Sequence, residues 1–336
     1  MALDEPLEER IAAILSALSA RWPNLDIESV RAANRKQAVI PAGSVILEPV
    51  GTAPGLLVPP QGGQNGPLVL VLPGPPSELK PMWKTALQTE PLTRLVGAAP
   101  ALERRMIRIF GIPESELAAS LRSIEETGLD LSELEITTCL RRGEIEIATT
   151  LSPSGEPAYE AFLAEIRIRH GILIFSEDER TIDQLVAELL QGETLAAAES
   201  CTGGLLATRL TEVPGASDYF LGGIVSYSNA VKESALGVGT DQLAEHGAVS
   251  EEVALSMAEG VRASLSASVG VGITGIAGPG GGTTEKPVGL VWIAVVKGSQ
   301  QLVRSVVIPG SRGDIRDRAT TISLHLIRRL LLGESD

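Results

Sequence analysis

The sequence contains few of the residues that build disulfide frameworks, metal centres and nucleic-acid surfaces. Its 336 residues include 2 cysteines and 3 histidines, too few and too scattered for a disulfide framework, a zinc cluster or a histidine-rich metal site. Aromatic residues make up 3% of the chain, and 42 acidic residues against 28 basic ones give a net charge of −14. This composition disfavours base-stacking platforms and direct binding to the nucleic-acid backbone.

Signatures of secretion and membrane insertion are also missing. The first residues, Met1 to Glu5, are acidic and lack the basic and apolar regions of a signal peptide. No uninterrupted apolar run approaches the roughly 18 residues of a membrane-spanning helix. We therefore expect a cytoplasmic protein without a membrane partner. Hydrophobic residues nevertheless account for 44% of the chain, enough to bury a sizeable core, and the length predicts about two domains.

Alternating helix and strand patterns organise the chain. We predict an amphipathic helix over residues 4–21. The continuous apolar run 68–72 is typical of a strand buried on both faces, and Ser77 is expected to cap the helix that follows. Residues 102–168 predict a strand, a helix, a hairpin and a helix, which is a small α+β unit. Over residues 181–332 strands alternate with helices, which predicts one layered α/β domain.

The segment 199–204 (Glu-Ser-Cys-Thr-Gly-Gly) follows a predicted strand and opens a predicted helix. Ligands of open α/β sheets bind at the carboxyl ends of strands, and N–H groups at a helix start favour an anion. The segment fits a ligand loop and equally a plain strand-to-helix turn, because it matches no standard phosphate-loop spacing. Cys201 could be a nucleophile with a lowered pKa, but a small buried apolar role is favoured, since no histidine lies near it in the sequence.

A second glycine-rich segment spans residues 272–289 and contains one lysine, Lys286. A dinucleotide-binding glycine motif is followed by a helix, whereas an apolar strand follows here, so that interpretation is disfavoured. The segment is either a binding loop, in which Lys286 neutralises a phosphate or carboxylate, or a solvent-exposed hairpin loop.

Hydroxyl and guanidinium groups stand in two further segments. Ser217 precedes a predicted strand, Tyr227 lies at the far end of that strand, and Lys232 follows. Histidine usually activates a serine, and no such triad is evident in this chain, so a tyrosine or lysine with a lowered pKa is the alternative. Spacing alone favours ordinary structural roles for Ser217 and Tyr227. Arg312, at the start of the last predicted helix, either binds a phosphate with two hydrogen bonds or lies in solvent.

Several motifs in the second half resemble a known family. They are 199–204 (Glu-Ser-Cys-Thr-Gly-Gly), 227–229 (Tyr-Ser-Asn), 247–250 (Gly-Ala-Val-Ser), 275–279 (Gly-Ile-Ala-Gly-Pro) and 285–289 (Glu-Lys-Pro-Val-Gly), in this order. Over roughly residues 175–333 the sequence resembles the C-terminal domain of the CinA family of competence/damage-inducible proteins. The resemblance implies hydrolysis of the carboxamide of nicotinamide mononucleotide, which gives nicotinic acid mononucleotide and ammonia in NAD salvage.

The resemblance also implies roles for individual residues. Ser217 would be the nucleophile, and Tyr227 would take its proton. Arg312 would lower the pKa of Tyr227 or stabilise charge, with Lys232 and Lys286 as further candidates for that cation. The two glycine-rich segments would bind the nucleotide through N–H groups suited to a phosphate or an oxyanion. The expected substrate-binding residues are Ser200, Cys201, Thr202, Gly203, Gly204, Asn229, Thr274, Gly275, Gly278 and Lys286. No metal or other cofactor is expected for this domain.

The N-terminal part resembles the second half of the family's molybdopterin-binding-like (MoaB/Mog-type) domain. The matching motifs are 34–38 (Asn-Arg-Lys-Gln-Ala), 50–55 (Val-Gly-Thr-Ala-Pro-Gly) and 72–78 (Leu-Pro-Gly-Pro-Pro-Ser-Glu). The family's earlier Gly-Thr-Glu and Gly-Gly-Leu-Gly-Pro-Thr motifs do not occur, so we expect an incomplete domain that either begins upstream or is degenerate. Metal-dependent hydrolysis of ADP-ribose, the family's activity in this domain, is therefore disfavoured, and a divalent metal is expected only if the domain is active.

The expected organisation is α/β throughout. It comprises a partial MoaB/Mog-like domain over residues 1–90, a small α+β connecting domain over 91–172 and a layered α/β amidase domain over 173–336. The expected partner is a small-molecule nucleotide, with no direct binding of nucleic acid, and the resemblance implies a homodimer. Two alternatives are a non-catalytic nucleotide-binding protein with competence partners and an ADP-ribose pyrophosphatase that acts through the N-terminal domain.

Overall fold

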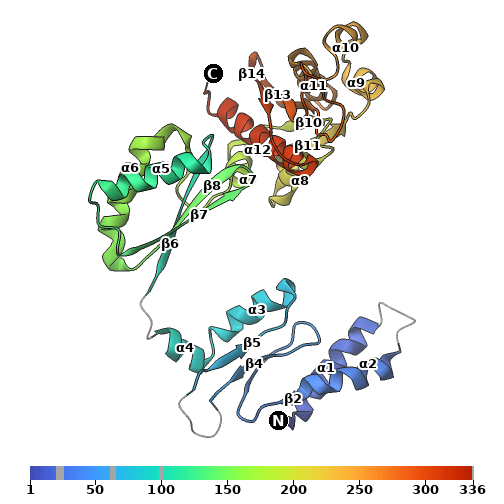
Figure 1. The fold of residues 1–336 in the computed structure, drawn as a ribbon. Helices are drawn as coiled ribbons and strands as arrows, with labels where there is room; N and C mark the ends of the chain where they lie inside the picture. Colours follow the sequence, from blue (N-terminus) through green and yellow to red (C-terminus); the bar gives the residue numbers. More distant parts are fainter. Residues whose placement is uncertain (20–25, 61–65, 98–100, 335–336) are drawn as a thin grey trace. The chain divides into compact units, whose positions relative to one another are not determined.

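The computed structural model describes the chain except for residues 20–25, 61–65, 98–100 and 335–336. The chain divides into two compact units, Met1–Pro100 and Ala101–Asp336, and each is described by itself (Figure 1). The predicted boundary at residue 90 coincides with the first residue of helix α4 (Glu90–Gly97), so the first unit extends beyond it. The division of the second unit at residue 172 stays a prediction.

Short strands and helices build the first unit. They are β1 (Ala2–Leu3), α1 (Glu5–Ser19), α2 (Ile27–Asn34), β2 (Val39–Ile40), β3 (Val45–Leu47), β4 (Gly55–Val58), β5 (Val69–Val71) and α3 (Pro76–Ala86). Strand β1 pairs with β2, and β3, β4 and β5 form an antiparallel sheet in that order. Helix α1 confirms the amphipathic helix predicted over residues 4–21 as far as Ser19, and residues 20 and 21 lie outside the described residues. The helix buries Leu7, Ile11 and Leu15 on one face.

Two details predicted for this unit are wrong. The apolar run 68–72 does form strand β5, but Val69 and Val71 are 46% and 45% exposed. Leu68, Leu70 and Leu72 pack against the apolar cluster on one face of the sheet, and the side chains of Val69 and Val71 alternate to the other face. Ser77 does not cap helix α3, since the N-cap residue is Pro75 and Ser77 lies in the first turn.

An antiparallel sheet covered by two helices opens the second unit. The elements are β6 (Glu103–Phe110), α5 (Glu114–Glu126), β7 (Leu134–Arg141), β8 (Glu144–Leu151), α6 (Glu156–His170) and β9 (Ile174–Ser176). The strand order is β7-β8-β6-β9. Leu117 of α5 and Phe162 of α6 pack on Ile107 and Ile147 of the sheet. The predicted order of strand, helix, hairpin and helix is confirmed, and β9 is an additional strand.

A layered α/β structure follows, as predicted. Its elements are α7 (Ile182–Leu189), β10 (Leu195–Glu199), α8 (Leu205–Glu212), β11 (Phe220–Val225), α9 (Asn229–Leu236), α10 (Thr240–His246), α11 (Glu251–Ser264), β12 (Val269–Gly275), β13 (Leu290–Lys297), β14 (Gln300–Val307) and α12 (Arg312–Leu331). In the sheet order β11-β10-β12-β13-β14, the first three strands are parallel and the last two are antiparallel to their neighbours. Helices α7, α8 and α12 cover one face of the sheet, and α9, α10 and α11 cover the other.

Helix α8 begins at Leu205 because a glycine turn precedes it. Gly203 and Gly204 have φ angles of 61° and 97°, a left-handed conformation that other residues adopt at a cost. The chain between β10 and α8 is therefore a tight turn that needs both glycines. Helices α9 and α10 were not predicted, because their short sequences lack a clear apolar stripe.

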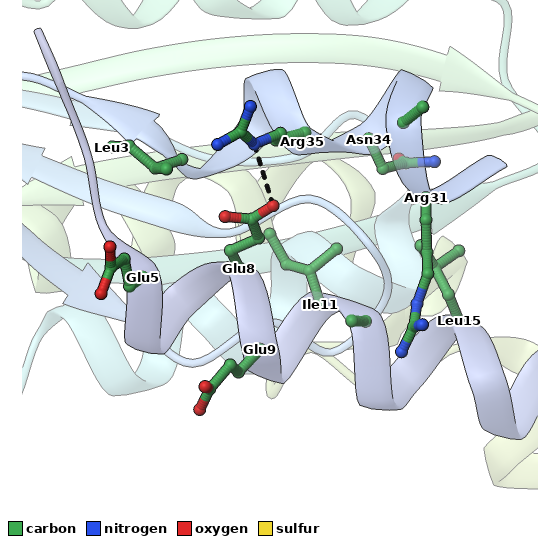
Figure 2. Close-up of a pocket in the computed structure, with 11 residues that line it drawn as sticks. Leu3, Glu5, Glu8, Glu9, Ile11, Leu15, Arg31, Asn34 and Arg35 are labelled. Atoms are coloured by element: carbon green, nitrogen blue, oxygen red, sulfur yellow. Dashed lines mark hydrogen bonds and ion pairs between the residues drawn. The ribbon is translucent and has the colours of Figure 1, made fainter. Parts of the chain in front are cut away.

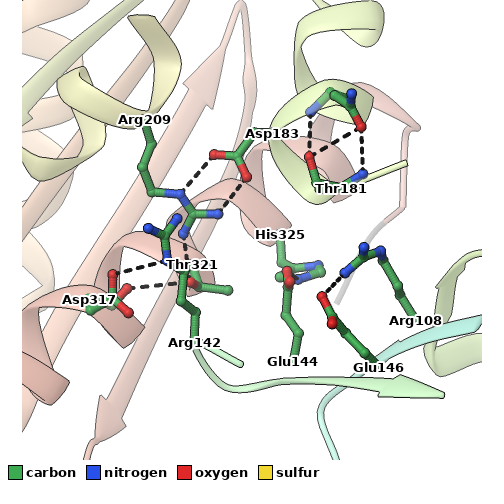
Figure 3. Close-up of polar contacts among 11 residues, drawn as sticks. Arg108, Arg142, Glu144, Glu146, Thr181, Asp183, Arg209, Asp317, Thr321 and His325 are labelled. Atoms are coloured by element: carbon green, nitrogen blue, oxygen red, sulfur yellow. Dashed lines mark hydrogen bonds and ion pairs between the residues drawn. The ribbon is translucent and has the colours of Figure 1, made fainter. Parts of the chain in front are cut away.

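Helix α12 joins the layered part of the second unit to the antiparallel sheet (Figure 3). His325 Nε2 lies 2.8 Å from Oε1 of Glu144 on β8, and its ring stacks on Phe110 with the centroids 3.7 Å apart. Burial lowers the pKa of His325 against the opposing effect of the Glu144 carboxylate. In the turn of the β7–β8 hairpin, Arg142 pairs with Asp317 of α12 at 3.6 Å.

Helix α11 packs directly on the backbone of β12. A Cβ atom on Gly270 would lie 2.1 Å from the carbonyl oxygen of Ala258, and one on Gly272 would lie 2.2 Å from that of Ala254. Glycine is required at both positions because only a residue without a side chain allows this close approach.

We expect Gly272→Ala to lower the free energy of unfolding by about 1–3 kcal/mol, the range typical of overpacking, because α11 must move away from β12. The matched control is Gly171→Ala, where a Cβ meets no atom within 4 Å and a change within about 0.5 kcal/mol is expected. Urea denaturation followed by circular dichroism measures both variants. Equal midpoints for the two would contradict the close packing of α11.

Candidate active site

Loops at the carboxyl ends of three parallel strands form the candidate site. Glu199 at the end of β10 lies opposite Val225 of β11 on one side and Ile273 of β12 on the other. The N–H of Ser226 donates to the carbonyl of Glu199 at 2.8 Å, and the N–H of Ser200 donates to that of Ile273 at 2.9 Å. The residues that follow these strands therefore meet at one edge of the sheet, where ligands of α/β sheets bind.

The buried carboxylate of Glu199 occupies the start of helix α8. Its oxygens accept the N–H groups of Gly204, Leu206 and Ala207 at 3.0, 3.1 and 2.8 Å. These are the groups that a helix start offers to an anion. The predicted anion site at this helix is therefore occupied by the protein's own side chain. Glu199 was missed as a functional residue, although an acidic residue beside a glycine turn and a helix start is a usable signal.

Ser200 and Lys232 form a buried hydroxyl–amine pair. Lys232 on α9 is 1% exposed, and its Nζ donates to Oγ of Ser200 at 3.1 Å and to the carbonyl of Ser226 at 2.7 Å. No carboxylate is among these partners, and burial lowers the pKa of Lys232. Ser200 is 8% exposed. Lys232, considered from the sequence only as a neighbouring cation, thus lies within hydrogen-bond distance of a serine.

Cys201 and Thr202 turn their side chains inward. Cys201 packs in the core, which fits the favoured apolar role, and burial raises its pKa to about 11, which disfavours a nucleophilic thiolate. Thr202 is 0% exposed. The carbonyls of both residues accept hydrogen bonds from Arg316 of α12 at 3.1 and 2.8 Å. The side chains of Cys201 and Thr202 therefore face away from the candidate site, and binding of substrate by their main-chain N–H groups stays a prediction. Arg316 is a positioning residue that the sequence did not reveal.

Arg312 connects three of the predicted segments. Its guanidinium donates to Oη of Tyr227 and to the carbonyl of Gly278, both at 2.8 Å. Tyr227 is 60% exposed, and Arg312 is exposed as well. The start of α12, the loop after β11 and the glycine-rich loop after β12 are thus joined at the surface, with a cationic group and an aromatic ring open to a ligand.

Lys286 fastens the glycine-rich loop to the segment before α11. Its Nζ donates to the carbonyls of His246 at 2.5 Å and Val249 at 2.8 Å. Oγ1 of Thr274 donates to the neighbouring carbonyl of Ala248 at 2.6 Å. Both side chains therefore hold main-chain segments in place. The ammonium of Lys286, which the sequence suggested as a counterion for a phosphate, thus has a structural role. Contact of Lys286 or Thr274 with a substrate stays a prediction.

Ser217 lies at the opposite end of strand β11 from Tyr227. Ser217 is in the short turn Ala216–Asp218 before β11, and Tyr227 follows the strand's last residue. At about 3.3 Å per residue, the six residues of β11 separate the two ends by about 20 Å. Tyr227 cannot take a proton from Ser217 over that distance. The predicted Ser217–Tyr227 pair is therefore wrong, because Ser217 precedes the amino end of β11 and Tyr227 follows its carboxyl end.

The remaining predicted residues lie at the carboxyl edge. Asn229 is the first residue of α9 and is exposed, Gly203 is exposed, and Gly275 ends β12 in a half-buried position. They are available to a ligand beside Ser200, and their binding of substrate stays a prediction.

The first unit has a cavity of about 490 Å³ on α1 and α2, lined on one side by Glu8 and Arg35, which form an ion pair at 3.0 Å (Figure 2). None of the predicted site residues lines this cavity. Within the described residues, no three His, Cys, Asp or Glu side chains are grouped so that they could hold a metal ion, and no helix is long and apolar enough to cross a membrane.

The fold and the site together define a layered α/β domain with a hydroxyl–amine pair at the carboxyl edge of its parallel strands. The chain belongs to the CinA family. The family model "CinA C-terminal domain" matches residues 179–331. A CinA-like protein of Mycobacterium sp. (strain JLS) is 52% identical over 330 residues, which cover 98% of this chain and 77% of that protein.

A further relative and a solved structure are also similar to this chain. A CinA-like protein of Mycobacterium tuberculosis (strain ATCC 25177 / H37Ra) is 50% identical over 339 residues, covering 99% of this chain and 77% of that protein. The crystal structure of the competence/damage inducible protein CihA from Agrobacterium tumefaciens is 40% identical with a TM-score of 0.42, and covers 43% of this chain and 92% of that one.

The two cysteines differ in exposure, and we expect thiol labelling to separate them. Cys139 is exposed and Cys201 is buried. The raised pKa of Cys201 leaves its thiol protonated at neutral pH. The folded protein should therefore release one equivalent of chromophore from Ellman's reagent, and two after denaturation. Cys139→Ala should abolish the reaction of the folded protein, whereas Cys201→Ala should leave it unchanged. A fast reaction of Cys201 in the folded Cys139→Ala variant would contradict the described burial.

Proposed function

We propose that the second unit hydrolyses the carboxamide of nicotinamide mononucleotide to nicotinic acid mononucleotide and ammonia, as an amidohydrolase of pyridine nucleotide salvage. Amide hydrolysis is supported by the contact of 3.1 Å between Nζ of Lys232 and Oγ of Ser200 in a buried position. The choice of substrate rests on the motifs shared with the CinA C-terminal domain. The nucleophile in this proposal is Ser200, in place of Ser217.

Lys232 is suited to act as the general base. Burial favours its neutral form, which can accept the proton of the Ser200 hydroxyl as the oxygen attacks the carboxamide carbon. The protonated Lys232 then donates to the leaving nitrogen, so that ammonia departs and an ester on Ser200 remains. A water molecule, deprotonated in turn by Lys232, hydrolyses the ester, releases the carboxylate product and restores the hydroxyl.

The turn after Ser200 is suited to stabilise the intermediate. A tetrahedral intermediate requires hydrogen-bond donors for its oxyanion. In this proposal, main-chain N–H groups of the turn supply them, other than those of Gly203 and Gly204, which donate to Ser200 and Glu199. Glu199 and Arg316 fix the turn from inside through its N–H groups and carbonyls, so the donors are held in place before the substrate binds.

Tyr227 and Arg312 are suited to bind the rest of the nucleotide. The nicotinamide ring of the substrate is a pyridinium cation, and the exposed ring of Tyr227 offers a face for a cation–π contact. Arg312 uses two hydrogen bonds for Tyr227 and Gly278, and the guanidinium has five N–H donors. The remaining donors can bind the 5′-phosphate. In this proposal Tyr227 is thus a binding residue and does not act as a base.

We expect the purified protein to release ammonia from nicotinamide mononucleotide in the presence of EDTA. Ser200→Ala should lower kcat/KM by about 10³-fold or more, as the loss of a nucleophile does. The matched control is Ser217→Ala, which lies at the other end of β11 and should retain activity.

The other outcomes of this assay separate the alternatives. Retained activity in Ser200→Ala together with loss in Ser217→Ala would overturn the assignment of the nucleophile. Absence of ammonia release would favour a non-catalytic nucleotide-binding protein. Product from ADP-ribose alone, and only with a divalent metal, would favour a hydrolase that acts through the first unit.

The rate should depend on the ionisation of Lys232. Because the base is the neutral amine, kcat/KM should rise with pH and level off above the lowered pKa of Lys232. Lys232→Arg should be inactive at every pH, since a guanidinium stays protonated, and Lys232→Met tests the loss of the amine in a side chain of similar length. The measurement is the initial rate of ammonia release between pH 6 and pH 10. An unchanged pH profile in Lys232→Met would contradict the role of the lysine.

A further inference from the structure

Strand β7 presents a free edge to solvent. Among the described strands it pairs with β8 alone, at the end of the order β7-β8-β6-β9. Apart from Leu134 and Ile136, which are half-buried, every residue of β7 is exposed, and Leu140 is 41% exposed. The strand contains no proline, and its register with β8 has no bulge. A long, regular, exposed edge strand of this kind readily pairs with another strand.

The hairpin turn determines which backbone groups point outward. Strands β7 and β8 are joined by Arg142 and Gly143, whose φ angles are 54° and 88°, as in a two-residue type I′ turn. In such a hairpin the flanking residues, Arg141 and Glu144, exchange both hydrogen bonds, and bonding alternates along the strand. The N–H and C=O groups of the even-numbered residues of β7 therefore point to the free edge.

The sequence of β7 is complementary to itself around Thr138. In an antiparallel pair of two copies with Thr138 opposite Thr138, Glu135 lies opposite Arg141 and Ile136 lies opposite Leu140, each twice by symmetry. Thr138 is even-numbered, so its outward groups form the central hydrogen-bonded pair. Moving the axis to residue 136 or 140, the next positions with outward groups, loses both charge pairs. The hydrogen bonding, the charges and the apolar pairs thus agree on one register.

We propose that two copies of this chain associate through β7, which pairs antiparallel with the partner's β7 across a two-fold axis at Thr138 and joins the two four-stranded sheets. The same patch serves both copies, as a two-fold interface requires. Opposite charges across the axis stabilise this register, and the paired strands satisfy each other's outward N–H and C=O groups.

Thr137→Cys tests the register directly. In the proposed register, Thr137 lies opposite Cys139 of the partner subunit in a pair without hydrogen bonds. The Cα atoms of such a pair are about 4.5 Å apart, which lies inside the range of about 4.4–6.8 Å for a disulfide. Mild oxidation of the full chain should give a covalent dimer on a non-reducing gel, and mass spectrometry should identify the new thiol bonded to Cys139.

Two variants control for this result. Glu135→Cys places the new thiol opposite Arg141 and should give no covalent dimer. Thr137→Cys combined with Cys139→Ser should also give none. A monomeric product from Thr137→Cys, or equal cross-linking by Glu135→Cys, would overturn the proposed register.

Charge reversal tests the interface without cross-linking. Glu135→Arg places arginines opposite each other twice and should raise the dimer dissociation constant by about tenfold or more, since like charges in directly opposite positions destabilise a strand pair. Adding Arg141→Glu should restore the dimer. Sedimentation velocity measures both variants and the unaltered chain. A monomeric unaltered chain, or a dimer insensitive to Glu135→Arg, would overturn the proposal. Arg141 also lies 3.9 Å from Glu146 of its own chain, so Arg141→Glu places two carboxylates near each other. If the double variant does not fold for this reason, the cross-linking experiment decides between the outcomes.

Discussion

The buried carboxylate of Glu199 is the interaction on which the candidate site depends. It ends β10 and accepts three N–H groups from the start of α8, so it fixes the glycine turn that carries Ser200. A helix start without this carboxylate would be open to an anionic ligand. With the carboxylate present, the phosphate of the proposed nucleotide substrate would need donors elsewhere at the edge, and in the proposal the exposed guanidinium of Arg312 supplies them.

The second constraint is the burial of Lys232 without a carboxylate partner. An ammonium removed from water needs compensation, and the hydrogen-bond partners described here are a hydroxyl and a carbonyl, both neutral. The balance shifts toward the neutral amine, which lowers the pKa of Lys232. In the proposed mechanism this amine, 3.1 Å from Ser200, is the base of a serine that lacks a neighbouring histidine. The same burial that makes a lysine unfavourable for stability makes it useful for proton transfer.

The sequence was sufficient for the layered α/β fold and for the loops of the site, because apolar periodicity and glycine motifs are local signals. It was not sufficient for the pairing of residues across the site. Ser217 and Tyr227 are close in sequence, yet β11 separates them, and residues close in sequence lie far apart when an extended strand connects them. Ser200 and Lys232 are distant in sequence and become neighbours through the parallel register of β10 and β11. Glu199 and Arg316 were missed because their side chains bind main-chain groups of the glycine turn, and these contacts exist only in the folded chain.

Helix α12 contacts both the candidate site and the antiparallel sheet. Its first residue, Arg312, binds Tyr227, and one turn later Arg316 holds the carbonyls behind Ser200. Further along the same helix, His325 is stacked on Phe110 and bonded to Glu144. A helix of 20 residues is about 30 Å long and stiff over that length. The position of Arg312 therefore depends on how α12 packs against the antiparallel sheet. Residues far from Ser200, such as His325, thus contribute to the geometry of the candidate site.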